Sequence, residues 1–244
     1  MRTILWAESV KLKRSKILWI AFFSAVMVAL IVFMQGQFTY YGRRYIDTVG
    51  WYMTAAQSLG SLYVLPALVA LVGSYLICRE DQEDTMKSLV LIPVSRPKLI
   101  GAKMIVTALL AVLLYAFLFM VTLVTEVALH GALLDARSIF RFARIYLVEG
   151  IGIFLAVSPV IAIVSRLKKS YWLALLFAEI YSFGALFAGM QQPLRSIYPV
   201  TAAFTVAGYY EAVPGQAVLS LCSLLACGVL SLILLRGLNK QSDV

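Results

Sequence analysis

Residues 104–128 read MIVTALLAVLLYAFLFMVTLVTEVA, a stretch in which Glu126 is the single charged residue. The hydrocarbon core of a bilayer is about 30 Å thick, so a helix needs roughly 20 apolar residues to cross it. Charged side chains are unfavourable at that depth. This stretch is therefore long enough and apolar enough to form a transmembrane helix.

Five other stretches have the same character, and together they predict six transmembrane helices: 17–34, 57–78, 104–128, 145–165, 171–190 and 216–235. The composition agrees, because the 244-residue chain is 62% hydrophobic and 14% charged, whereas soluble domains are roughly 45–50% apolar and 25% charged. Strand-like alternation is absent, and lipid admits only helices or closed barrels. We expect an all-α, polytopic membrane protein with a single transmembrane domain over residues 1–244.

Several classes of protein are excluded. Cys78, Cys222 and Cys227 lie in or beside predicted spans without CxxC spacing, so neither a disulfide framework nor a zinc site is expected. His130 is the single histidine, which excludes a multi-histidine metal centre.

The first span is too long for the apolar region of a cleaved signal peptide, and no small-x-small site follows it. The distribution of the +9 net charge favours a membrane surface over nucleic acid as its partner.

The Lys and Arg residues between the spans predict the orientation. With a cytoplasmic N-terminus, fifteen of them lie inside and six outside. We therefore expect a multi-pass protein of the cytoplasmic membrane with both termini in the cytoplasm. The basic segment 2–16 is expected either to anchor the first span or to lie on the inner leaflet as an interfacial helix with Trp6 at headgroup level, and the two roles are compatible.

Segment 191–215, on the outer side, contains three prolines and the apolar run YPVTAAFTVA at 198–207. The run is too short to cross a bilayer. A re-entrant or interfacial segment is the expected structure.

The loop between the second and third spans contains REDQEDTMK (79–87) followed by SLVLIPVSR (88–96). A helix over 80–92 is expected, because acidic residues at its start favour the helix dipole, Glu83 and Lys87 are an i,i+4 pair, and Pro93 ends it. One face of this helix would be apolar and the opposite face charged, formed respectively by Met86, Leu89, Val90 and Pro93 and by Glu80, Asp84 and Lys87. Many charged loops are simply solvated; an amphipathic helix in this loop would instead offer a docking surface to a soluble partner.

These residues resemble the permeases of type-2 ABC exporters, especially the small six-span subunits of bacitracin, lantibiotic and other peptide export or immunity systems. Those families carry a pattern like E-x-x-x-G-T-x-K-x-L-x-x-x-P-[VI]-S-R-x-x-[LI]-x-x-K between spans two and three. It is matched here by Glu80, Thr85-Met86-Lys87-Ser88-Leu89, Pro93-Val94-Ser95-Arg96, Leu99-Ile100 and Lys103, with Asp84 in place of the usual glycine. Their opening E-x-x-K-x-x-R-S-K is matched by Glu8, Lys11 and Arg14-Ser15-Lys16.

The resemblance implies a permease that works as a dimer of two such chains, identical or not, and exports an amphipathic or hydrophobic substrate such as an antimicrobial peptide. ATP and magnesium would bind to separate ABC ATPase subunits. Segment 80–92 would be the coupling helix that docks on the ATPase, 2–16 an interfacial connecting helix and 191–215 an extracellular re-entrant element. The ATPase-coupling residues would be Glu80, Glu83, Asp84, Thr85, Met86, Lys87, Leu89, Val90, Pro93 and Arg96.

The chain itself is expected to have no catalytic, cofactor-binding or metal-binding residues. It contains no G-x-x-x-x-G-K-[ST] phosphate-binding loop, so it is not expected to be the nucleotide-binding subunit.

Glu126, Glu149 and Glu179 fall inside or at the edge of predicted spans, where an ionisable residue usually faces protein or water. We expect a structural role for Glu126, and Arg141 or Arg144 to neutralise Glu126 and Glu149. Glu179, nearer mid-span, is expected to be protonated or bonded to a neighbouring helix. Both Glu149 and Glu179 are candidates for lining a transport pathway, with a packing role equally open.

An alternative function is an ion- or proton-coupled carrier or channel that uses Glu149 and Glu179 without an ATPase. This alternative gives no role to segment 80–92, and neither does a purely structural scaffold. An intramembrane enzyme is disfavoured, because a single loop histidine provides no paired acid-base or metal cluster.

Overall fold

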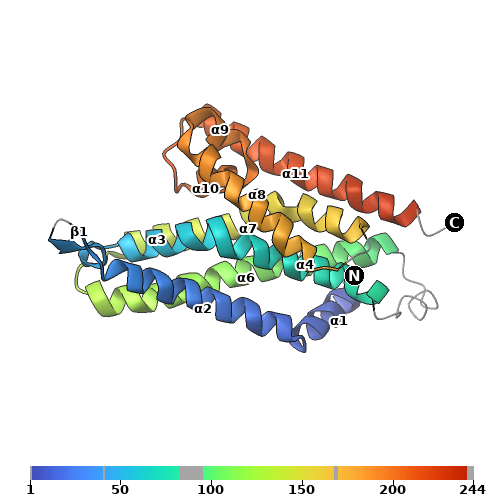
Figure 1. The fold of residues 1–244 in the computed structure, drawn as a ribbon, viewed down its shortest axis with the longest axis horizontal. Helices are drawn as coiled ribbons and strands as arrows, with labels where there is room; N and C mark the ends of the chain where they lie inside the picture. The colour runs from blue at the N-terminus through green and yellow to red at the C-terminus, as the bar shows by residue number, and fades with distance from the viewer. Residues whose placement is uncertain (1, 41, 83–95, 168–169, 241–244) are drawn as a thin grey trace.

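Long helices lie side by side in the computed structural model (Figure 1), which describes residues 2–40, 42–82, 96–167 and 170–240. The helices are α1 (Arg2–Lys13), α2 (Lys16–Gly36), α3 (Trp51–Leu59), α4 (Leu65–Gln82), α6 (Arg96–His130), α7 (Ala136–Arg166), α8 (Leu173–Met190), α9 (Gln192–Ile197), α10 (Pro199–Ala207) and α11 (Pro214–Lys240). A short loop hairpin of β1 (Thr39–Tyr40) and β2 (Arg43–Arg44) follows α2, with the single turn η1 (Tyr45–Asp47) after it.

Six helical segments in the described part of the chain are long and apolar enough to cross a membrane: Lys16–Gly36, Trp51–Arg79, Pro97–His130, Ala136–Arg166, Leu173–Met190 and Pro214–Gly237. The expected all-α class with six transmembrane helices is thereby confirmed. Figure 1 shows both termini at one end of the bundle and the β1–β2 hairpin at the other, as an even number of antiparallel spans requires.

The second span is the central helix of the bundle and is built from three pieces. It runs through α3, a π-helical turn η2 (Gly60–Val64) and α4, and its apolar window is 78% buried, more than that of any other described span. Pro66 lies in the first turn of α4. Because proline has no amide hydrogen to donate to the preceding turn, the hydrogen-bond pattern changes beside it, and a π-turn is one way to accommodate that change.

The apolar run of segment 191–215 forms the short helix α10, which packs against α7 and α11. Gly152, midway along α7, allows the close approach, since a Cβ atom there would lie 2.8 Å from Cβ of Ala203. At the end of α10, Gly208 adopts a left-handed conformation with φ of 87°, which favours glycine. The segment thus folds back against the bundle without crossing it.

Candidate functional site: the helix ends that flank residues 83–95

The residues expected to contact an ATPase lie only partly in the described structure. Glu80 belongs to the end of α4, and Arg96 begins α6. The other eight lie outside the described residues: Glu83, Asp84, Thr85, Met86, Lys87, Leu89, Val90 and Pro93. The described part of the site consists of the helix ends on either side of 83–95.

Tyr75 connects the end of α4 to two other elements. Its ring lies 5.6 Å from the guanidinium carbon of Arg79 and 5.2 Å from the ring of Tyr171, just before α8. Its hydroxyl accepts a 3.2 Å hydrogen bond from Oγ of Ser15, at the start of α2. The base of α4 is therefore joined to the first and fifth spans.

Lys103 connects the beginning of α6 to α4. Its side chain is buried, and its ammonium group donates a hydrogen bond to the carbonyl of Leu76. The helices also approach closely here, because a Cβ atom at Gly73 would lie 2.6 Å from Cδ1 of Ile161 in α7 and 3.0 Å from Cγ2 of Thr107 in α6. The two helices on either side of 83–95 are thus fixed to each other and to α7.

Helix α1 packs against α6 at the same end of the bundle. Glu8 faces inward at 1% exposure and forms a 2.8 Å ion pair with Lys11, while Leu12 joins the hydrophobic core. Trp6 is 69% exposed on the outward side. This amphipathic arrangement is compatible with the interfacial position expected for segment 2–16.

The expectation of one helix over 2–16 was wrong at its end. Helix α1 stops at Lys13, and Ser15 is the N-cap of α2, where its extended backbone lets Oγ accept a 3.3 Å hydrogen bond from the amide of Ile17. Serine is a preferred residue at this position because it satisfies an amide that the helix leaves unpaired.

Glu126 is buried near the opposite end of the bundle. One carboxylate oxygen accepts a 2.7 Å hydrogen bond from the amide of Gly50 and lies 3.0 Å from Nδ1 of His130. The expectation that Arg141 or Arg144 would neutralise it was wrong, because both arginines are exposed on the first turns of α7. His130 is one helical turn from Glu126 and is the nearer partner. These contacts are compatible with the structural role expected for Glu126.

Glu149 is 0% exposed, in a polar cluster within the bundle. Its carboxylate accepts a hydrogen bond from the amide of Gln57, so the expected arginine partner is again replaced. Nearby, the hydroxyl of Tyr115 donates to Ser61 at 2.8 Å. Sequence analysis missed Gln57, although an amide at the start of an apolar span is a signal that another polar group faces it.

Glu179 differs from the other two acids because it is only half-buried on α8. Within the part of the chain that the structure describes, it has neither a hydrogen-bond nor an ion-pair partner. The bond to a neighbouring helix that we expected is therefore not found there.

Comparison with known protein families places these elements in context. The family described as ABC-2 family transporter protein matches residues 4–185, from α1 to α8. The chain belongs to the ABC-2 transporter family. It is therefore a multi-pass permease subunit of an ABC transporter, a transport component that is not itself catalytic, and membership of the family implies an ABC ATPase partner. No curated protein sequence matches the chain significantly.

In this ABC-2 permease, the described helix ends form a connected block. Tyr75 links α4 to the start of α2 and to Tyr171, two residues before α8, and Lys103 links α6 to α4. Packed interiors resist deformation, so a displacement applied to one of these helix ends is transmitted to its neighbours.

Proposed function

We propose that this permease exports an amphipathic or hydrophobic compound, of the peptide or antimicrobial class, with energy from a separate ATPase that binds ATP and magnesium. The ATPase docks on residues 80–96 from the cytoplasm, where both termini lie. Support comes from the family match and from the two sequence patterns shared with small peptide-exporting permeases.

The observation that carries the pathway proposal is the position of Glu179. Residues three to four positions apart share a helix face, and from Glu179 this face continues through Phe183, Phe187 and Met190, which are all exposed. An ionisable residue at membrane depth faces protein or water, not lipid. We therefore infer that a second permease chain or a water-filled pathway covers this face of α8.

Glu149 has a different environment. Its carboxylate is enclosed by helices of its own chain and accepts a hydrogen bond from Gln57. This environment favours a packing role for Glu149. The pathway role is assigned to Glu179, which lies on the exposed face of α8.

The test is co-purification of the tagged permease from its native membranes in a mild detergent. The unaltered protein is expected to retain an ATPase in stoichiometric amount. Leu89→Asp is expected to lose it, because Leu89 belongs to the apolar face of the helix that the sequence predicts, and a carboxylate there would oppose burial in a protein groove. The control is Val49→Asp, which makes the same kind of change at an exposed position between η1 and α3, and these elements lie with the β1–β2 hairpin at the opposite end of the bundle.

Retention of the ATPase by Leu89→Asp would place the docking site elsewhere. Recovery of the folded permease alone, together with ATP-independent flux in vesicles, would replace the proposal with the carrier mechanism.

A further inference from the structure

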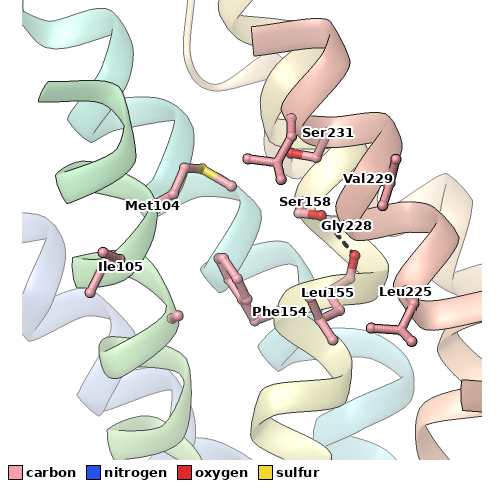
Figure 2. Close-up of a pocket in the computed structure, with 11 residues that line it drawn as sticks. Met104, Ile105, Phe154, Leu155, Ser158, Leu225, Gly228, Val229 and Ser231 are labelled. Carbon is pink, nitrogen blue, oxygen red and sulfur yellow. Dashed lines mark hydrogen bonds between the residues drawn. The ribbon is translucent and has the colours of Figure 1, made fainter. Parts of the chain in front are cut away.

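An apolar groove lies between α6, α7 and α11, on a part of the bundle that neither the ATPase nor the pathway proposal uses. Figure 2 shows its base, formed by Phe154 and Leu155 of α7, with Ile105 of α6 on one side and Leu225 and Val229 of α11 on the other. The cavity has a volume of ≈ 330 Å³. Its side walls are about half exposed, so the groove opens toward the surrounding lipid.

The α11 wall leads from the apolar groove to a cation. Leu225, Val229 and Leu232 are spaced four and three residues apart, and Arg236 follows after four more. This spacing puts all four residues on one helix face. Arg236 is exposed at the end of the bundle where the termini lie.

The other two helices of the groove have a basic residue at the same end. Lys98 is exposed and precedes Ile105 by seven residues, which puts it on the groove side of α6. Arg166 follows Leu155 by eleven residues on α7 and is fixed to α11 by a 2.7 Å hydrogen bond from Nε to the carbonyl of Leu234. Leu234 lies on the face of α11 opposite Leu232 and Arg236, so Arg166 is held away from the groove and the cations at its mouth are Lys98 and Arg236.

A hydroxyl lines the groove near the end that faces the cations. Ser231 lines the groove at 1% exposure, and its Oγ has no hydrogen-bond partner among the described residues. It precedes Arg236 by five residues, or about 7.5 Å along the helix axis at 1.5 Å per residue. A buried hydroxyl without a partner is unfavourable, so a ligand that supplies an acceptor at this depth would be stabilised.

The order of these groups along the groove is cations, then a hydroxyl, then a channel lined by apolar side chains. A phospholipid has the matching order of phosphate, ester carbonyl and acyl chain. We propose that the groove binds one anionic phospholipid from the leaflet on the side of the two termini. The anionic class follows from the two cations, Lys98 and Arg236, because basic pockets between transmembrane helices favour acidic headgroups.

The experiment uses the full chain, purified in a neutral detergent and titrated with phosphatidylglycerol or with phosphatidylcholine of the same acyl chains, with bound lipid counted by native mass spectrometry. One phosphatidylglycerol is expected to bind more tightly than phosphatidylcholine. Lys98→Gln and Arg236→Gln are each expected to weaken its binding roughly fivefold, since a juxtamembrane cation contributes about 1 kcal/mol. Arg137→Gln and Arg141→Gln, at the far end of α7, are the controls and should leave binding unchanged.

Two further variants test the interior of the groove. Ala108→Phe fills the channel and should abolish binding, whereas Leu109→Phe, on an exposed position outside the groove, should not. Ser231→Ala should weaken binding without changing the thermal stability of the lipid-free protein. Equal affinity for the two lipids, or unchanged binding in both Lys98→Gln and Arg236→Gln, would overturn the proposal even if Ala108→Phe failed to fold.

Discussion

Lys103 of α6 donates a hydrogen bond from its buried ammonium group to the backbone carbonyl of Leu76 in α4. These are the two helices that flank residues 83–95, so the bond joins the helix that precedes this segment to the helix that follows it. Lys103 also belongs to the sequence pattern shared with type-2 exporter permeases. We infer that it makes α4 and α6 respond together to a partner docked between them.

Replacing Lys103 with methionine should therefore lower both stability and coupling. Methionine keeps most of the apolar stem but removes the ammonium group, and hydrogen bonds to charged groups contribute about 1.5–3 kcal/mol. Thermal unfolding in detergent should show a lower midpoint, and reconstituted vesicles should transport less substrate per ATP hydrolysed. Lys13→Met, on an exposed side chain at the end of α1, is the matched control. Equal midpoints for the two variants would contradict this role.

The buried pair of Gln57 and Glu149 makes a second prediction. Leucine at either position leaves the other polar group without its partner, which should lower the free energy of unfolding by about 1–3 kcal/mol. The loss of stability in the double variant should be smaller than the sum of the losses in the two single variants. The difference, which is the coupling energy, should be about 0.5–3 kcal/mol. Combining Gln57→Leu with Glu126→Leu, whose partners are different residues, should give additive effects. Additive effects in the double variant of Gln57 and Glu149 would mean that the hydrogen bond between them contributes nothing to stability.

The transmembrane helices were predictable from the sequence because apolar length is a local property. The helix of 104–128, for example, is the apolar centre of α6, which begins at Arg96 with residues that include Lys98 and Lys103. The length of an apolar stretch does not show that the polar residues before it belong to the same helix. The residue at which a helix begins or ends depends on contacts with neighbouring helices and headgroups. The boundaries of the spans were therefore less predictable than the presence of the spans.

The partners of the buried acids were not predictable, because they depend on which helices become neighbours. Glu149 bonds to Gln57, 92 residues away, and Glu126 bonds to Gly50, 76 residues away. Sequence analysis considered only nearby arginines. It did identify Glu179 as an acid near mid-span with no basic residue at its depth, and the described structure gives it no partner within the chain.

Gly152 makes a prediction about the re-entrant helix. Gly152→Ala adds a Cβ atom 2.8 Å from that of Ala203, so α10 must move away from α7, and overpacking of this kind lowers stability by about 1–3 kcal/mol. Gly101→Ala is the matched control, since its Cβ atom would meet nothing within 4 Å. Alanine there should raise stability by about 0.5–1 kcal/mol, because it favours the helix. Thermal unfolding of both variants checks the opposite signs, and an unchanged or raised stability of Gly152→Ala would contradict the close approach.

Glu179→Gln should reduce export while leaving the co-purified ATPase unchanged, because the proposed role of this carboxyl is on the pathway and not at the docking site. The measurement is substrate export from cells, together with the amount of ATPase retained on the tagged permease. Glu211→Gln makes the same change in an exposed loop and should not affect export. Normal export by Glu179→Gln would remove this residue from the pathway.

The exposed face of α8 that contains Glu179 should also be the contact between two permease chains. The native cysteines are first replaced by alanine. Phe183→Cys should then form a disulfide-linked dimer when membranes are treated with a mild oxidant, since two copies of a residue near a two-fold axis approach each other. Val124→Cys, on an exposed position of α6, is the control and should stay monomeric. The native cysteines to be replaced are Cys78, Cys222 and Cys227. A dimer from Val124→Cys and none from Phe183→Cys would move the interface to α6 and leave the α8 face to a different partner.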